Sequence, residues 1–134
     1  MKLVHVPPTF IDLAWTQGAS SLEEACNEEC TIDQLKMTLS RGEKQLFRFN
    51  DSEGNPVGWM VCFAVNYPNF RALSITNLVA HNTKMWDYTD QLKALAASMG
   101  CSRIRCCAKP AQARLYRMKM GFEPVYETLE ISLT

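Results

Sequence analysis

Six cysteines and two histidines are the side chains of this sequence best suited to metal or redox chemistry. Cys26 and Cys30 are four residues apart and would share one face of a helix, which is a spacing that zinc ligands use. No second pair with ligand spacing accompanies them, and the two histidines are isolated. Adjacent Cys106 and Cys107 would point to opposite faces of a strand, which does not suit a disulfide scaffold. The pattern favours reduced, buried thiols in a cytoplasmic protein over a zinc site, so we expect no metal.

Charged side chains are distributed unevenly along the chain. Residues 103–119 contain six basic side chains and no acidic one, whereas the first forty residues hold six acidic side chains against two lysines. The 14 basic and 14 acidic residues of the whole chain cancel, which argues against a globally basic nucleic-acid binder. The basic stretch suits a solvated face, or a contact with a coenzyme phosphate, an acidic protein surface or nucleic acid. Nucleic acid is the least favoured of these partners, because no recognised nucleic-acid motif accompanies the charges.

The length and hydrophobicity of the chain limit which class of protein it belongs to. With 134 residues, of which 47% are hydrophobic, we expect a single domain over residues 1–134 with a substantial core. The longest apolar run, residues 59–65, is far shorter than the roughly 20 residues of a membrane span. The first residues contain no apolar stretch of signal-peptide length. We therefore expect a protein of the cytoplasm without a membrane role.

The first third of the chain is predicted to be helical. Residues 9–29 show a helical pattern that is interrupted near Gly18. Thr31 followed by Gln34 has the form of a capping box, and it begins a short amphipathic helix that ends at Gly42.

Strand patterns then replace the helical ones. Residues 45–50 and 57–65 are predicted strands joined by a turn around Gly54, and residues 72–80 form a third. Three consecutive strands with short connections indicate an antiparallel meander.

The remaining chain alternates between helix and strand. Helices are predicted over residues 85–99 and 111–120, with a strand over 102–108 between them. The closing segment alternates apolar and polar residues and is predicted to be the last strand, with one apolar face made of Leu129, Ile131 and Leu133. The fold class is α/β (α+β), a mixed sheet in which a meander is followed by strand–helix–strand–helix–strand.

Residues 113–125 (ARLYRMKMGFEPV) carry the most specific local motif, a short helix that ends at Gly121 and leads into the last strand. With the order of elements over residues 1–134, this motif resembles the GNAT superfamily of N-acetyltransferases. The opening residues 4–8 (VHVPP) and the overall length resemble small GNAT-like proteins of tailed phages and prophages. The resemblance implies a GNAT-like mixed central sheet.

The resemblance also implies acetyl-CoA as coenzyme, held at a gap between two parallel strands and by backbone N–H groups at the next helix N-terminus. The segment at that place lacks the family's glycines, and Trp86 is bulky there. Lys84 would offset part of the repulsion between a diphosphate and Asp87. The residues expected to bind the coenzyme are Leu78, Val79, Ala80, Asn82, Thr83 and Lys84.

In the reaction that the resemblance implies, an amine attacks the thioester and a tyrosine gives a proton to the departing thiolate. Tyr116 is the candidate general acid. It lies five residues before Gly121, one more than the family spacing, and one residue rotates a side chain by ~100° around a helix. The strand before the loop has no glutamate to act as base, which leaves His81 and Glu127 as candidates.

Two tryptophans have possible roles other than packing in the core. Trp86, on an exposed loop, would block the coenzyme groove or fill it in place of a ligand. The apolar strand around Trp59 would supply the surface of a homodimer.

Two functions therefore stand side by side. One is a GNAT-type enzyme that transfers an acetyl group from acetyl-CoA to an unidentified amine of a small molecule or a protein. The other is a catalytically inactive GNAT-fold phage protein, which acts as a virion, assembly or host-interaction module with a phage or host protein as its partner.

Overall fold

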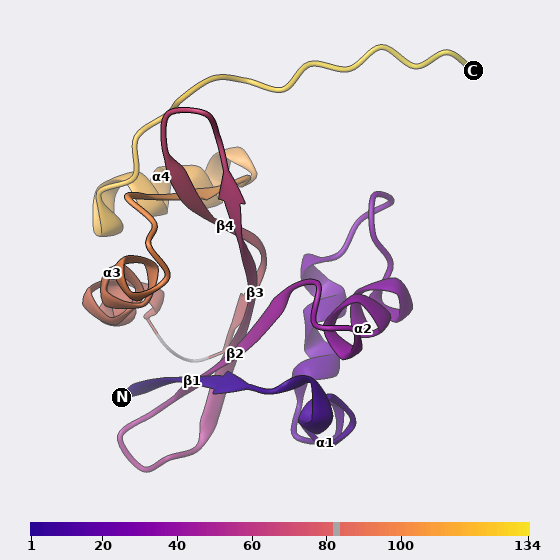
Figure 1. Cartoon of the computed structure of the whole chain (residues 1–134), viewed down its shortest axis with the longest axis vertical. Coiled ribbons are helices and arrows are strands. Elements are labelled where there is room, and N and C mark those ends of the chain that lie inside the picture. Colours follow the sequence, from indigo (N-terminus) through magenta and orange to yellow (C-terminus); the bar gives the residue numbers. More distant parts are fainter. Residues whose placement is uncertain (82–83) are drawn as a thin grey trace.

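A five-stranded mixed sheet forms the centre of the protein, and helices cover both of its faces (Figure 1). The computed structural model describes residues 1–81 and 84–134. Its strands follow one another across the sheet in the order β1-β2-β3-β4-β5. The strands are β1 (Lys2–Val6), β2 (Gln45–Asn50), β3 (Pro56–Asn66), β4 (Arg71–Ala80) and β5 (Arg103–Cys106). The α-helices are α1 (Ile11–Thr16), α2 (Ile32–Ser40), α3 (Thr89–Ser98) and α4 (Pro110–Met120), and the 3-10 helices are η1 (Pro8–Phe10), η2 (Ala19–Ala25) and η3 (Met85–Tyr88).

Most elements lie where the sequence pattern predicted them. The first four strands pair antiparallel, whereas β4 and β5 are parallel. This arrangement confirms the predicted meander and mixed sheet. Strand β1 was not predicted from the sequence, because it is short, is followed at once by Pro7, and pairs only with β2, about forty residues away in the chain.

Each face of the sheet has its own apolar core. One core packs α1, η2 and α2 against Leu46, Val61 and Val79. The other packs η3, α3 and α4 against Met60 and Leu73. Because side chains alternate along a strand, neighbouring residues of β3 and β4 enter opposite cores.

Trp59 lies in the first of these cores and is almost completely buried. The prediction that the strand around it offers a homodimer surface is therefore wrong. A continuous apolar run in a central strand is buried on both faces of the sheet, and here helices cover both.

The closing strand is the other correction. Residues 121–134 form no strand: the chain first passes β5, where the Tyr126 ring lies 5.9 Å from the Arg105 guanidinium, and only then runs away from the sheet (Figure 1). Leu129 and Ile131 are each 86% exposed, and Leu133 is 96% exposed. Alternation predicts which face of a strand is apolar, but a strand also needs a neighbouring strand, and no strand in the described part of the chain pairs with this segment.

The capping box at the start of α2 is confirmed. The Thr31 hydroxyl accepts the Gln34 backbone N–H at 3.4 Å, and the Thr31 N–H donates to the Gln34 side chain at 3.0 Å. We expect Thr31→Ala to lower the free energy of unfolding by about 1 kcal/mol, because it leaves one helix N–H without its partner. Urea unfolding measures this loss, and Thr38→Ala, inside the same helix, is the control. An unchanged stability in Thr31→Ala would mean that the cap contributes nothing.

Within the described residues, every helix is too short or too polar to span a membrane.

Candidate functional site

The parallel strands β4 and β5 separate at one end of the sheet. Their ladder runs from the Ala72–Arg103 pair to the Ile75–Cys106 pair and ends there. β4 continues for five residues, to Ala80, while the chain after Cys106 turns away toward α4. The last residues of β4 consequently keep one edge free of β5, and polar backbone groups along that edge are able to bind a ligand.

A small apolar cavity of about 10 Å³ lies inside this gap. Leu78 of β4, Cys106 of β5 and Tyr116 of α4 border it together, so three elements distant in sequence meet there. Its other walls are mainly large, flexible side chains: Met60, Ile75, Met85, Leu92, Met120 and Phe122. A cavity this small accommodates a single water molecule and widens only if those side chains move.

Tyr116 reaches the gap although its spacing from Gly121 differs from the family pattern. Gly121 ends α4 in the left-handed conformation (φ 81°), and the Phe122 N–H donates to the Tyr116 carbonyl at 3.3 Å. The two rings then lie 5.9 Å apart between centroids. This turn folds Phe122 back against Tyr116, and the tyrosine is held half-buried at the cavity.

The environment of Tyr116 favours its protonated form. Burial raises the pKa of the phenol, and the nearby Cys106 thiol raises it further. Burial likewise raises the pKa of Cys106 to about 11, with a smaller contribution from Cys107. At neutral pH both groups keep their protons, which suits Tyr116 to donate one and leaves Cys106 a poor nucleophile.

The residues predicted to bind the coenzyme do not all lie on one side of the sheet. Leu78 and Ala80 pack on the core that contains α3, and Val79 enters the opposite core. Lys84 is exposed at the residue before η3, and the Asp87 N–H donates to its carbonyl at 3.0 Å. Of the predicted residues, Asn82 and Thr83 lie outside the part of the chain that the structure describes.

Trp86 lies in η3, the turn that leads into α3. It is half-buried against the core, and the Lys119 ammonium of α4 lies 5.6 Å from the centre of its ring. This cation–π contact joins η3 to α4 beside the gap.

Tyr88 anchors η3 from within the core. Its hydroxyl donates to the Asn50 carbonyl at 2.7 Å, and its ring meets Phe49 edge-on at 4.9 Å. The turn before α3 is therefore fixed to β2 across the sheet.

Neither predicted base lies at the cavity. His81 is exposed, with its Nε2 atom 3.7 Å from a carboxylate oxygen of Glu24. Glu127 lies in the exposed segment after α4. Within the described residues, the walls of the cavity contain no carboxylate or imidazole.

The sequence analysis did not find Cys106, Phe122 or Met85 at the site. Phe122 follows the helix-ending Gly121 directly, and this position was the available signal, because the glycine turns the chain back toward the helix. Cys106 and Met85 gave no comparable signal.

The order and pairing of the elements match a fold that is found in solved N-acetyltransferases. The chain is similar to the ribosomal-protein-alanine N-acetyltransferase from Brucella melitensis biovar Abortus 2308, with a TM-score of 0.71 at 13% identity over 99% of this chain and 100% of that one. It is similar to the glucosamine-6-phosphate N-acetyltransferase from Arabidopsis thaliana, with a TM-score of 0.65 at 12% identity over 99% and 98% of the two chains. An aminoglycoside antibiotic 6′-N-acetyltransferase from Acinetobacter baumannii matches with a TM-score of 0.67 at 8% identity over 99% and 97%.

No family model matches the sequence, and no curated protein matches it. Similarity to solved structures is therefore what shows the fold. Because the identities are this low, the comparisons do not show which substrate the protein uses.

Proposed function

We propose that the protein is an N-acetyltransferase that uses acetyl-CoA and holds it at the gap between β4 and β5. The observation that carries this proposal is the juxtaposition of a free β4 edge with a half-buried, protonated tyrosine. The edge offers backbone groups to an extended polar chain, and Tyr116 offers a proton where the two strands part.

The residues around the gap fit the parts of this coenzyme. The free backbone edge beyond Ile75 suits its amide-containing arm. Lys84 is an exposed cation just before the N-terminal end of η3 and α3, where N–H groups and the helix dipole favour phosphate. When bound, the coenzyme supplies a thioester whose acyl carbon accepts an amine.

The chain's own contribution to the reaction is proton donation. The new C–N bond forms as the C–S bond breaks, and the sulfur leaves with the electron pair. Tyr116 holds its proton at neutral pH because burial raises its pKa, so it is able to protonate that sulfur. The proton released by the amine passes to solvent, since no carboxylate or imidazole borders the described cavity.

A specific observation favours a second function. The cavity has a volume of only about 10 Å³. A gap this small is also what a GNAT-fold protein without catalysis would have. Such a protein would act as an interaction module, in the virion or host cell if the chain is phage-encoded, as the resemblance of residues 4–8 to phage proteins suggests.

Isothermal titration calorimetry with acetyl-CoA distinguishes the two functions. We expect binding with a Kd in the micromolar range, which corresponds to about −8 kcal/mol. Absence of heat at millimolar acetyl-CoA would refute the enzyme and leave the interaction module. Binding to free CoA with the same affinity is compatible with the enzyme, because both share the phosphates.

Reversing the charge of Lys84 tests how the phosphates are held. We expect Lys84→Glu to weaken acetyl-CoA binding at least about tenfold, because an attractive charge becomes a repulsive one. Lys2→Glu, an exposed lysine on β1, changes the net charge equally and is expected to leave the affinity unchanged. Equal weakening by both substitutions would show that only overall charge matters.

A further inference from the structure

Arg105 of β5 carries a buried hydrogen-bond donor without an acceptor. Its Nε atom is shielded from solvent, and within the described residues no acceptor lies in hydrogen-bond distance of it. The ion pairs found in that part of the chain do not include its guanidinium either. Buried polar groups are nearly always paired with protein, water or a ligand. This unpaired donor therefore marks a place where an acceptor belongs.

Aromatic rings hold the guanidinium of Arg105 in position. It lies 4.8 Å from the centre of the Phe70 ring, 5.1 Å from that of Tyr67 and 5.9 Å from that of Tyr126. The guanidinium of Arg103 lies 3.7 Å from the centre of the Phe70 ring. A guanidinium that stacks on rings keeps the N–H groups in its plane for a carboxylate or phosphate, which it binds through two parallel hydrogen bonds. We name Tyr67, Phe70, Arg103 and Arg105 the arginine cluster.

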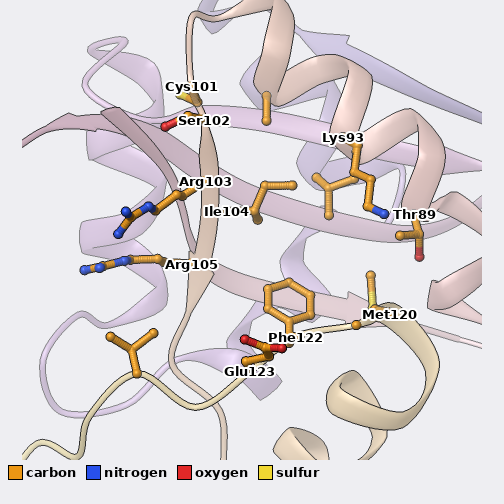
Figure 2. A pocket seen from close by; sticks show the side chains of 14 residues that line it. Thr89, Lys93, Cys101, Ser102, Arg103, Ile104, Arg105, Met120, Phe122 and Glu123 are labelled. Carbon is orange, nitrogen blue, oxygen red and sulfur yellow. The ribbon is translucent and has the colours of Figure 1, made fainter. Parts of the chain in front are cut away.

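The arginine cluster lies on the face of the sheet opposite to Tyr116. Figure 2 shows a hollow of about 500 Å³ beside β5, with Ile104 pointing toward α3, whereas Arg103 and Arg105 point to the other side of the strand. Cys106, the next residue, borders the cavity together with Tyr116. This order follows from the alternation of side chains along a strand.

A row of side chains crosses this face of the sheet beside Arg105. The register pairs Arg105 with Ser74 and Ser74 with Phe63, and residues paired in this way share a face. The Lys44 ammonium lies 5.3 Å from the centre of the Phe63 ring, at the other end of the row. All four side chains are half-buried. The row therefore has a cation at each end and a hydroxyl between them.

The arginine cluster adjoins the place where β4 and β5 separate. Their ladder ends at the Ile75–Cys106 pair, and Arg105 precedes that pair by one residue, which is about 3.3 Å along a strand. On the α3 side, large apolar side chains border the gap and leave a cavity of about 10 Å³. An amine that reaches the gap from the opposite face of the sheet passes Arg105.

We infer that the acceptor of the acetyl group is an amine that also carries an acidic group, a carboxylate or a phosphate, and that Arg105 binds this group. Since it names the acceptor, this inference rests on the proposed acetyltransferase function. The Nε–H and one Nη–H of Arg105 donate to two oxygens of the acid, and Arg103 adds a second positive charge. The amine then lies toward the end of the ladder. Arg105 is a specificity-determining residue and takes no part in proton transfer.

Matched amines with and without an acidic group test this specificity. The pairs are lysine with cadaverine, phenylalanine with 2-phenylethylamine, and phosphoethanolamine with ethanolamine. We expect kcat/KM to be about 10–100-fold higher for the acid-bearing member, which is the effect of charge-assisted hydrogen bonds. A preference in the first two pairs identifies a carboxylate, and one in the third pair identifies a phosphate. Equal kcat/KM within all three pairs would overturn the inference.

Substitution of Arg105 tests which residue binds the acid. We expect Arg105→Gln to remove the preference and Arg105→Lys to retain part of it, because an ammonium keeps the charge but not the planar pair of donors. Arg114→Gln removes a cation from the exposed side of α4 and is the control, with the wild-type preference expected. A preference that survives Arg105→Gln in full would overturn the assignment to Arg105.

The NMR signal of the Arg105 Nε–H provides a readout that needs no turnover, and its absence in Arg105→Gln identifies it. We expect this signal to shift saturably with lysine, phenylalanine or phosphoethanolamine, and not with their acid-free partners. No shift with any of the three would overturn the inference, whether or not the protein binds acetyl-CoA. A shift in a protein that binds no acetyl-CoA would instead refute the proposed function: the site for an acidic group would stand, and its role in binding an acceptor would be overturned.

Discussion

Tyr116→Phe is expected to lower the rate of acetyl transfer by about 10²–10⁴-fold and to leave the affinity for acetyl-CoA unchanged. This range is typical for the loss of a positioned general acid. The substitution removes the hydroxyl and keeps the ring, which packs against Phe122 and borders the cavity. Steady-state rates with a panel of amines, together with calorimetry on the same variant, measure the two quantities separately.

Tyr67→Phe is the matched control for this experiment. Tyr67 lies in the loop between β3 and β4, at the opposite end of β4 from the gap, and packs on Phe70. Removal of the Tyr67 hydroxyl is expected to leave the rate of acetyl transfer at the wild-type value. If the Tyr116→Phe variant keeps the full wild-type rate of acetyl transfer, Tyr116 is not the general acid, even if the protein is an acetyltransferase.

The pH dependence gives a further readout of the same role. A general acid works only while it carries its proton, and burial raises the pKa of Tyr116 above its ordinary value of 10.0. Activity is therefore expected to persist into alkaline solution and to fall only above pH 10. A fall near pH 7 would point to a different titrating group.

Alkaline pH is expected to destabilise the fold through Cys62. This thiol is completely buried in the core between the sheet and α3, and burial raises its pKa from 9.0 to about 12, with Cys101 adding to the shift. Between these values the unfolded chain releases a proton that the folded chain retains. Stability contributed in this way is present below pH 9 and is lost as the pH rises toward 12. By pH 11 the loss is about 3 kcal/mol.

Urea unfolding at a series of pH values measures this effect. The variant Cys62→Ala is expected to have lower stability at pH 7, because it leaves a cavity, and a shallower decline above pH 9. Cys107→Ala removes an exposed thiol and is the control, with the wild-type decline expected. If Cys62→Ala declines as steeply as wild type, the buried thiol is not the source of the alkaline loss.

Local rules predicted much of the fold from the sequence. The capping box of Thr31, the turn around Gly54 and the helix-ending Gly121 depend on residues close together in the chain, and all three are found in the structure. β1 was missed because a short alternating segment becomes a strand only through its distant partner β2. The prediction of a closing strand fails for the opposite reason, since the alternation of residues 129–133 is clear but no described strand pairs with them.

The candidate site was predictable only in part. The motif around Tyr116 predicted a helix over residues 111–120, which is α4 in the structure, and Tyr116 borders the same cavity as Leu78. The packing of α4 against the sheet, as well as the spacing from Gly121, sets where this side chain lies. Residues 78–80 were predicted to bind the coenzyme as one segment. Because side chains alternate along a strand, Val79 enters the opposite core from Leu78 and Ala80.

An NMR titration of the isotope-labelled protein with acetyl-CoA tests the central claim most directly, because it reports both binding and place. The account predicts saturable shifts of amides at the end of β4, at the start of α3 and around Tyr116, with none along α1 and α2. Shifts confined to the α1 and α2 face, or no shifts at millimolar acetyl-CoA, would contradict a coenzyme site between β4 and β5.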